Sequence, residues 1–280
     1  MTPNPDNRQP ENRQKVTVPS VVRRKSTGER LSMITAYDAT FARLVDEAGI
    51  DMILVGDSVG MVVQGVDNTL PVGLEEMAYH VELVARTRPK ALVVGDLPFG
   101  SYQVSPQQAV ESSIVLMKRG AECVKLEGGT HMAETIDAIS RIDIPVMGHI
   151  GLTPQSVHRM GGHKVQGRQA GYEAGGRDRL LEDAVAVERA GAFALVIEGV
   201  PRDLAKEITA KVSIPTIGIG AGPDCDGQVL VLHDVLGLTP TRYKFAKAFV
   251  DLRQQVIDAT AAYVEDVRTG VWPDDAHSFH

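Results

Sequence analysis

Carboxylates stand at the ends of three consecutive apolar runs of this 280-residue chain: Asp57, Asp96 and Glu127. Lys125 precedes Glu127 by two positions, so both side chains lie on the same face if this run is a strand. If the runs are adjacent parallel strands of a barrel, their carboxyl ends meet within reach of one ion. Three carboxylates so close raise one another's pKa values unless a cation is present. The oxygen-only donor set predicts a hard ion such as Mg²⁺.

Other interpretations of these acidic residues stay open at this point. Each aspartate could instead cap the helix that follows its strand. Glu198 ends a later run in an apolar setting, which raises the pKa of a carboxyl towards neutrality and makes it a candidate general base. Its alternative role is to favour the dipole of a helix opened by Pro201. His149 could donate a hydrogen bond to a substrate oxygen or could be structural, and its role is left open.

Eight apolar runs of this kind alternate with stretches of helical period. The runs are residues 31–37, 51–57, 91–97, 123–128, 145–151, 194–200, 215–220 and, less clearly, 229–236. Eight strands alternating with helices predict a (β/α)8 TIM barrel, with an N-terminal extension and a long C-terminal helix. A doubly wound open sheet is the main competitor, but the glycines at 218–222 lack the acidic residue of a dinucleotide fingerprint.

Composition narrows the class of protein further. The chain has 29 basic and 36 acidic side chains and a formal charge of −7, which argues against nucleic acid as a partner. No apolar run approaches the roughly 18 residues of a membrane span. Cys123 and Cys225 lack metal-ligand spacing, which favours free thiols in a reducing cytoplasm. We expect residues 1–15 to be a disordered N-terminal segment without a signal peptide, and residues 16–280 to be a single barrel domain.

Two segments have open roles. A long helix is expected from about residue 241 to 268, with an apolar stripe that either covers the flank of the barrel or reaches a neighbouring subunit. The stretch 159–168 is rich in glycine and basic residues and has too few apolar residues for a regular element. It is either a mobile loop that excludes water over the mouth of the barrel, or a solvated connection without a role.

Together these residues predict a metal-assisted enolisation. A 2-keto acid is the simplest substrate, because its carboxylate and ketone oxygens can both bind the ion while Lys125 neutralises the remaining charge. Glu198 then removes the C3 proton, and the enolate attacks an electrophilic carbon. Composition and spacing lead to this class of reaction and no further.

Longer motifs make a more specific connection. From about residue 30 to its end, the chain closely resembles the ketopantoate hydroxymethyltransferase family. The matching motifs include Thr35-Ala36-Tyr37-Asp38 and Lys125-Leu126-Glu127-Gly128-Gly129, and the others lie at residues 54–58, 96–99, 148–156, 161–168, 218–222 and 277–280. Several run to six or more positions, so the resemblance concerns the site as well as the fold.

The resemblance implies a transferase that moves a hydroxymethyl group from 5,10-methylenetetrahydrofolate, its co-substrate, to 3-methyl-2-oxobutanoate. The product is 2-dehydropantoate, a precursor in pantothenate biosynthesis, and one Mg²⁺ per subunit assists the reaction. Carried over by position, the implied residues are Asp57, Asp96 and Glu127 as magnesium ligands, Asp57, Ser58, Asp96 and Lys125 as substrate contacts, and Glu198 as the proton acceptor. The resemblance also implies a homo-oligomer, usually a decamer, that takes only small-molecule substrates.

Two rival functions share some of these features. A Mg²⁺-dependent lyase or mutase of the phosphoenolpyruvate mutase and isocitrate lyase type also uses a barrel and an enolate-like intermediate. Such enzymes commonly carry a cysteine on a mobile loop over the site, and neither cysteine here lies in 159–168. A non-catalytic barrel scaffold is expected to lose the base or the lysine, yet Glu198 and Lys125 are both present.

Overall fold

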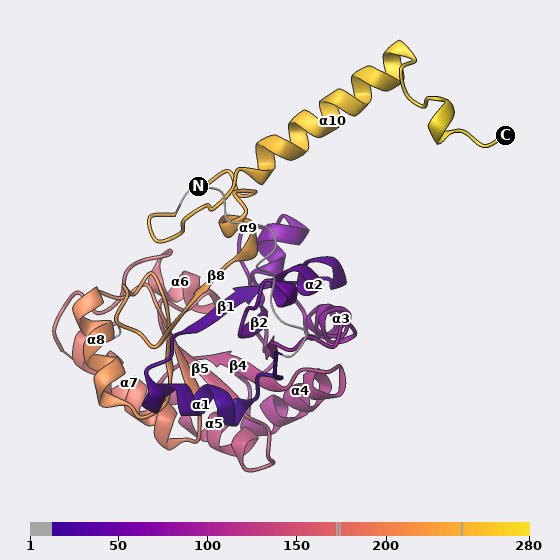
Figure 1. Ribbon diagram of the computed structural model, residues 1–280. Helices are drawn as coiled ribbons and strands as arrows, with labels where there is room; N and C mark the ends of the chain where they lie inside the picture. Colours follow the sequence, from indigo (N-terminus) through magenta and orange to yellow (C-terminus); the bar gives the residue numbers. More distant parts are fainter. Residues whose placement is uncertain (1–12, 172, 174, 242) are drawn as a thin grey trace. The chain divides into compact units, whose positions relative to one another are not determined.

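Eight parallel strands form a closed barrel in the part of the chain that this computed structural model describes, residues 13–171, 173, 175–241 and 243–280. They follow one another in chain order, and the first pairs with the eighth to close the circle (Figure 1). The strands are β1 Leu31–Thr35, β2 Met52–Val55, β3 Leu92–Asp96, β4 Cys123–Glu127, β5 Val146–Gly151, β6 Ala194–Glu198, β7 Thr216–Ile219 and β8 Gly227–Leu230. The predicted (β/α)8 barrel is confirmed.

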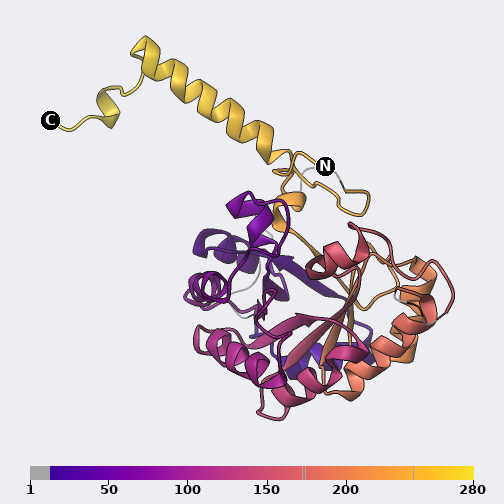
Figure 2. The same ribbon diagram turned by 180° about the vertical axis from the view of Figure 1, so that it is seen from behind.

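Helices surround this barrel, as Figure 2 shows from the opposite side. They are α1 Val18–Thr27, α2 Ala39–Glu47, α3 Leu74–Ala85, α4 Pro106–Lys118, α5 Ala133–Ser140, α6 Val157–Met160, α7 Arg177–Arg189 and α8 Arg202–Lys211. Three short turns follow strands: the π-helix η1 Gly60–Gln64 after β2, and the 3₁₀ turns η2 Thr130–Met132 after β4 and η3 Pro154–Ser156 after β5. Because helices cover the outer face, β2 to β5 are buried along their whole length.

Helix α4 shows how the sequence sets the ends of these elements. Ser105 caps its first turn, since its hydroxyl accepts a hydrogen bond from the backbone N–H of Gln108, and Pro106 occupies the first position, where no N–H is needed. The chain leaves the helix through Gly120 at φ 105°, a conformation that glycine adopts without steric cost. Gly191, at φ 99°, repeats this device after α7. Each glycine directs the chain into the next strand.

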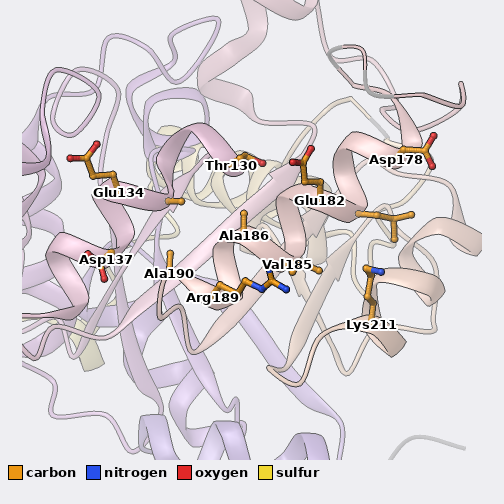
Figure 3. A pocket seen from close by; sticks show the side chains of 12 residues that line it. Thr130, Glu134, Asp137, Asp178, Glu182, Val185, Ala186, Arg189, Ala190 and Lys211 are labelled. Atoms are coloured by element: carbon orange, nitrogen blue, oxygen red, sulfur yellow. The ribbon is translucent and has the colours of Figure 1, made fainter.

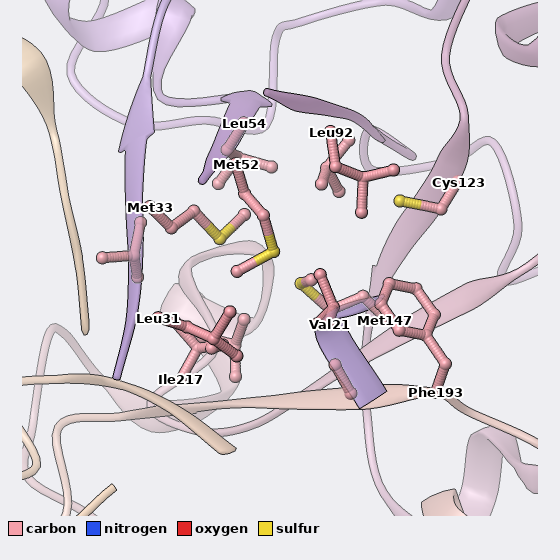
Figure 4. Packing of buried hydrophobic residues seen from close by; sticks show 14 of the residues in the cluster. Val21, Leu31, Met33, Met52, Leu54, Leu92, Cys123, Met147, Phe193 and Ile217 are labelled. Atoms are coloured by element: carbon pink, nitrogen blue, oxygen red, sulfur yellow. The ribbon is translucent and has the colours of Figure 1, made fainter. Parts of the chain in front are cut away.

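Apolar side chains fill the barrel towards the amino ends of its strands (Figure 4). Met33, Met52 and Met147 come from β1, β2 and β5 and pack in one buried cluster. Methionine suits this place because its flexible side chain fills irregular gaps. Val21 of α1 is fully buried in the same cluster, so α1 closes this end of the barrel. Only the carboxyl ends of the strands are left to form a site.

The first described residues lie against the barrel. Arg13 Nη1 is 3.1 Å from Asp46 Oδ1, and Lys15 Nζ is 2.5 Å from Glu122 Oε2. Residues 13–15 of the segment expected to be disordered, 1–15, are thus described and two of them make ion pairs, whereas residues 1–12 lie outside the described residues.

The described chain divides into two units, one that ends at Val231 and one from Leu232 to His280. The boundary falls inside the expected eighth run, 229–236. β8 ends at Leu230, and the next residues form a short helix, α9 Leu232–Val235, instead of continuing the strand. An apolar run alone does not distinguish a buried strand from a buried helix, which explains the difference.

In the second unit, helix α10 covers Leu252–Thr269, so the expected helix over 241–268 is wrong at its start. The backbone N–H of Phe249 donates to the carbonyl oxygen of Val235 at 2.8 Å. The chain before α10 thus pairs with the end of α9 and does not form helical turns. The unit also contains the 3₁₀ turn η4 Asp275–His277. In the described chain, neither α10 nor any other helix combines the length and the apolar character needed to cross a membrane.

Gly151 provides a test of how closely β5 and β6 approach. Its φ is +96°, and a Cβ there would lie 2.2 Å from the backbone oxygen of Glu198, whereas Gly28 at φ +73° has no atom within 4 Å of such a Cβ. We expect Gly28→Ala to lower the free energy of unfolding by about 1 kcal/mol, from backbone strain alone. Gly151→Ala should cost about 3 kcal/mol, because steric overlap is added. Urea denaturation followed by circular dichroism measures both, and equal losses would contradict this packing.

Candidate active site at the carboxyl ends of the strands

Ionisable side chains gather where β2 to β5 end. Asp96 and Glu127 are the last residues of β3 and β4, and Asp57 follows β2 by two positions. The register of the strands places Asp96 beside Lys125, and Glu127 beside His149. All five side chains belong to residues that are at most 5% exposed. The residues that the sequence analysis singled out on separate strands thus come together in one buried cluster.

The ammonium group of Lys125 links the members of this cluster. Its Nζ is 2.9 Å from Oδ1 of Asp96 and 3.3 Å from Nδ1 of His149. Burial by itself lowers the pKa of Lys125, but the carboxyls of Asp96, Glu127 and Asp57 outweigh this effect and raise it above its usual value. Lys125 is therefore a buried cation at neutral pH, surrounded by acidic groups.

The carboxyls themselves are difficult to ionise in this setting. Burial raises the pKa of Asp96 to about 7, while Lys125 opposes the rise and Asp57 adds repulsion. The pKa of Glu127 is raised well above its usual value, again chiefly by burial, with Lys125 opposing. The mutual repulsion expected from the sequence is present, but the loss of hydration is the larger cause. A bound cation would favour the ionised forms of both.

The candidate metal ligands fit a hard cation by their donor chemistry. Asp57, Asp96 and Glu127 offer carboxylate oxygens from three adjacent parts of the barrel wall. Oε1 of Glu127 is buried without a hydrogen-bond partner among the described residues, which suits an oxygen that binds an ion. Among the described residues, however, no group of three His, Cys, Asp or Glu side chains has the geometry of a metal site. The ligand role of these three residues stays a prediction.

The hydrogen bonds of the two aspartates exclude the alternative that they cap helices. Oδ2 of Asp96 accepts from the backbone N–H of Asp57 at 3.2 Å, and Oδ2 of Asp57 accepts from Nε2 of Gln155 at 2.9 Å. The helix after β3, α4, is capped by Ser105, and η1 after β2 has Val59 at its N-cap position, where no side chain makes a capping hydrogen bond. Both carboxyls therefore face the cluster.

Gln155 and Tyr102 complete the cluster, although sequence reasoning missed them. The backbone N–H of Gln155 donates to Oε2 of Glu127 at 3.0 Å, and the hydroxyl of Tyr102 donates to Oε1 of Gln155 at 2.7 Å. Both residues are buried and come from the connections after β5 and β3. Hydrophobic periodicity does not place side chains in such connections. The one available signal was that Gln155 lies within the motif at 148–156.

Glu198, the predicted base, is the last residue of β6 and faces His149 of the neighbouring strand β5. Oε2 of Glu198 is 3.3 Å from Nε2 of His149, although the pair lacks the geometry of an aligned hydrogen bond. Burial raises the pKa of Glu198 to about 7, and Lys125 and His163 act in the opposite direction. The helix that follows, α8, has Pro201 as its N-cap, so Glu198 lies three positions before the cap and outside the first turn, where the dipole acts most strongly.

His149 lies between the lysine and the base. Burial and the charge of Lys125 hold the pKa of His149 well below its usual value, so the ring is neutral. Because an ammonium group can only donate, Nδ1 of His149 accepts from Lys125, and the ring proton is assigned to Nε2. This places an N–H opposite the Glu198 carboxyl. His149, whose role the sequence left open, thus contacts both Lys125 and Glu198, the candidate base.

Ser58 and the stretch 159–168 border the cluster. The hydroxyl oxygen of Ser58 is 2.8 Å from that of Tyr37, and its role in substrate binding stays a prediction. Beyond Met160, the stretch has no helix or strand. The backbone N–H of Gln166 donates at 2.9 Å to the carbonyl of Gly199, the residue after the candidate base. The stretch therefore lies beside this base, as a covering loop requires, whereas its movement stays a prediction.

A groove of about 930 Å³ lies elsewhere, on the outside of the barrel between α5 and α7 (Figure 3). Its lining combines apolar Leu181 and Val185 with charged Glu134, Glu182 and Arg189. None of the candidate site residues lines it, so the groove is separate from the buried carboxyl cluster.

Comparison of the whole structure with solved structures shows the fold. A phosphonopyruvate hydrolase solved with oxalate and Mg²⁺ matches with a TM-score of 0.60 at 14% identity, covering 94% of this chain and 92% of that one. A 2,3-dimethylmalate lyase, a member of the PEP mutase/isocitrate lyase superfamily, matches with a TM-score of 0.59 at 16% identity, covering 95% and 93%. Identities this low support a shared barrel and no shared activity.

Sequence comparison is far more specific. The 3-methyl-2-oxobutanoate hydroxymethyltransferase of Pelobacter propionicus is 55% identical over 271 residues, which cover 96% of this chain and 98% of the relative. Its counterpart from Geobacter sulfurreducens is 56% identical over 266 residues, covering 94% and 98%. A family model described as ketopantoate hydroxymethyltransferase matches residues 15–275. With a match over almost its whole length and relatives above half identity, the chain belongs to the ketopantoate hydroxymethyltransferase family.

Proposed function

We propose that this protein transfers a hydroxymethyl group from 5,10-methylenetetrahydrofolate to 3-methyl-2-oxobutanoate, forming 2-dehydropantoate for pantothenate biosynthesis. Family membership supports the reaction. One observation assigns this reaction to particular residues. The site combines Glu198, a carboxyl of raised pKa, with the buried Lys125, which lies among three other carboxyls. An enolising reaction needs such a base opposite a positively charged wall.

The substrate binds with its charged end at this wall. A Mg²⁺ ion held by Asp57, Asp96 and Glu127 would polarise the ketone and stabilise the negative charge of the enolate. Lys125 places a second positive charge 2.9 Å from Asp96 and so attracts the carboxylate of the keto acid. Ser58, next to Asp57, offers a hydroxyl for the same end of the substrate. Binding with this end at the wall turns C3 towards β6, which carries Glu198.

Glu198 accepts the C3 proton on its carboxylate. A pKa near 7 suits this task, because the group is ionised in part of the population at neutral pH yet basic enough to accept a proton. The N–H of His149 faces the carboxylate, with Nε2 at 3.3 Å from Oε2 of Glu198. The C3 carbanion, delocalised into the enolate, then forms a bond to the one-carbon unit. The two bonds from this unit to the folate nitrogens break, and one water supplies the hydroxyl group. The other hydrogen of the water and the proton held by Glu198 go to the two nitrogens, and tetrahydrofolate is released.

Assembly and cellular setting form part of the proposal. We propose a homo-oligomer, and a decamer in particular, that works in the cytoplasm. Large apolar side chains of α10 support assembly, since Val256, Tyr263 and Val267 are exposed to 52%, 58% and 47% in the single chain. Cys123 and Cys225 are free thiols, as is usual in a reducing compartment. Light scattering coupled to gel filtration tests the stoichiometry.

The rival functions have less support. The barrels of the lyase and mutase type share only 14% and 16% identity with the chain, whereas hydroxymethyltransferases share more than half of its residues. A non-catalytic scaffold has no need for buried charges, which cost stability unless they are paired. Lys125 and Glu127 would be expendable in such a protein.

Exchange of the C3 proton tests the base directly. In D₂O with Mg²⁺, we expect the protein to exchange the C3 proton of 3-methyl-2-oxobutanoate, as followed by NMR without folate. Glu198→Gln should slow the exchange by about 100- to 10,000-fold, the usual contribution of a general base, while the Kd of the keto acid changes little. Wild-type protein with EDTA is the control for the metal. Undiminished exchange by Glu198→Gln would remove this residue from its role.

The pH dependence of the exchange is a second test. Because only the ionised base accepts a proton, the rate should rise with pH around an apparent pKa of about 7 and level off above it. His163 lowers the pKa of Glu198, so His163→Gln should move the rising limb to higher pH. His131→Gln is the matched control and should leave the limb in place. A profile that is flat between pH 6 and 8 would argue for another base.

Replacement of Lys125 tests the positive wall. Lys125→Met keeps most of the length of the side chain but removes its charge, and we expect the KM for the keto acid to rise about tenfold or more. The free energy of unfolding should fall by about 3 kcal/mol, because Asp96 loses its buried partner. Lys206→Met, at an exposed position on α8, serves as the control. An unchanged KM would show that Lys125 has only a structural role.

A further inference from the structure

Gln155 occupies a central position among the predicted metal ligands. It lies in η3 after β5 and is 6% exposed. Its side-chain nitrogen Nε2 donates to Oδ2 of Asp57 at 2.9 Å and to the carbonyl oxygen of Leu97 at 3.0 Å. Its backbone N–H donates to Oε2 of Glu127 at 3.0 Å. One residue thus contacts the carboxyl of Asp57, just after β2, and that of Glu127, at the end of β4, and these two strands are not neighbours.

The orientation of the Gln155 amide follows from the chemistry of its partners. The carbonyl of Leu97 can only accept a hydrogen bond, so the NH₂ group must face it and Asp57. The amide oxygen is then on the side of Tyr102 and accepts from its hydroxyl at 2.7 Å, and from Nε2 of Gln103 at 3.1 Å. All four hydrogen-bonding positions of the amide are used. Gln155 therefore has a single well-defined orientation.

Tyr102 fixes this orientation from behind. It is 1% exposed, and its hydroxyl also accepts from the backbone N–H of Glu127 at 3.1 Å. A hydroxyl has one proton, which goes to the shorter contact with the Gln155 oxygen. Tyr102 thus connects the side chain of Gln155 to the backbone of the ligand residue at the end of β4.

These contacts engage one oxygen of each carboxylate and, in Glu127, leave the other oxygen without a hydrogen bond. Gln155 engages Oδ2 of Asp57 and Oε2 of Glu127. The other oxygen of Glu127, Oε1, is buried and accepts no hydrogen bond from the described residues. A carboxylate pinned through one oxygen presents the other in a fixed direction, which is how partners beyond the direct ligands usually orient a metal site.

We propose that Gln155, supported by Tyr102, is a positioning residue that orients Asp57 and Glu127 so that both bind the same divalent cation. The inference rests on the proposed function, because it presupposes the metal site. It assigns no contact with substrate to Gln155. Its removal should therefore weaken metal binding first and affect the rate only through the metal.

Binding of Mn²⁺ alone to the full chain tests this role, measured by the electron paramagnetic resonance of the free ion. Gln155→Met keeps the length of the side chain and the backbone N–H but removes the amide, and we expect the Kd for Mn²⁺ to rise about 10- to 100-fold. Tyr102→Phe removes only the hydroxyl behind the amide and should give a smaller increase. Gln107→Ala, on the exposed side of α4, is the matched control and should bind as the wild type does.

C3 exchange at increasing Mg²⁺ separates positioning from direct catalysis. The rate of Gln155→Met should return to near the wild-type rate at saturating Mg²⁺, with only the metal concentration at half-maximal rate increased. A wild-type Kd for Mn²⁺ in both Gln155→Met and Tyr102→Phe would overturn the inference and leave the metal site standing. A rate that stays low at saturating metal would also overturn it. If the wild type binds no Mn²⁺, the proposed metal site falls together with this inference.

Discussion

A buried ammonium among buried carboxyls is the constraint on which the rest of the site depends. Desolvation works against every charge in the cluster, and the carboxyls of Asp96, Glu127 and Asp57 around Lys125 keep the lysine ionised. This arrangement requires side chains from neighbouring strands at fixed register, which a closed parallel barrel supplies. The barrel therefore keeps these charged side chains close together in a setting from which water is largely excluded.

Two sets of contacts radiate from this centre, and they divide the work of the site. On one side, Lys125 contacts His149, which faces Glu198, so the state of the base is linked to the cation through a neutral ring. On the other side, Gln155 joins Asp57 to Glu127 through its side chain and its backbone. In the proposed mechanism, the first set serves proton transfer and the second orients the carboxylate oxygens that bind the metal. A substitution in one set of contacts removes no direct contact of the other set.

Much of this arrangement was predictable from the sequence, for physical reasons. Alternation along a strand predicts that Lys125 and Glu127 share a face, and the repeated strand–helix pattern predicts that Asp96 adjoins them; both are found. Gln155 was not predictable, because it reaches the cluster through the path of a turn, and no periodicity describes such a path. The start of α10 was predicted wrongly, since the N–H of Phe249 bonds outside any helix and composition alone does not reveal such pairing.

The apolar cluster of Val21, Met33, Met52 and Met147 at the amino end of the barrel has a kinetic consequence. Because apolar side chains fill the amino end among the described residues, molecules would have to reach the carboxyl cluster from the carboxyl ends of the strands. In the proposed reaction the small keto acid reaches the depth of this passage, whereas the much larger folate occupies its rim. A folate that arrived first would obstruct the way in. Binding and release are then ordered: the keto acid binds before the folate, and the larger keto-acid product leaves after tetrahydrofolate.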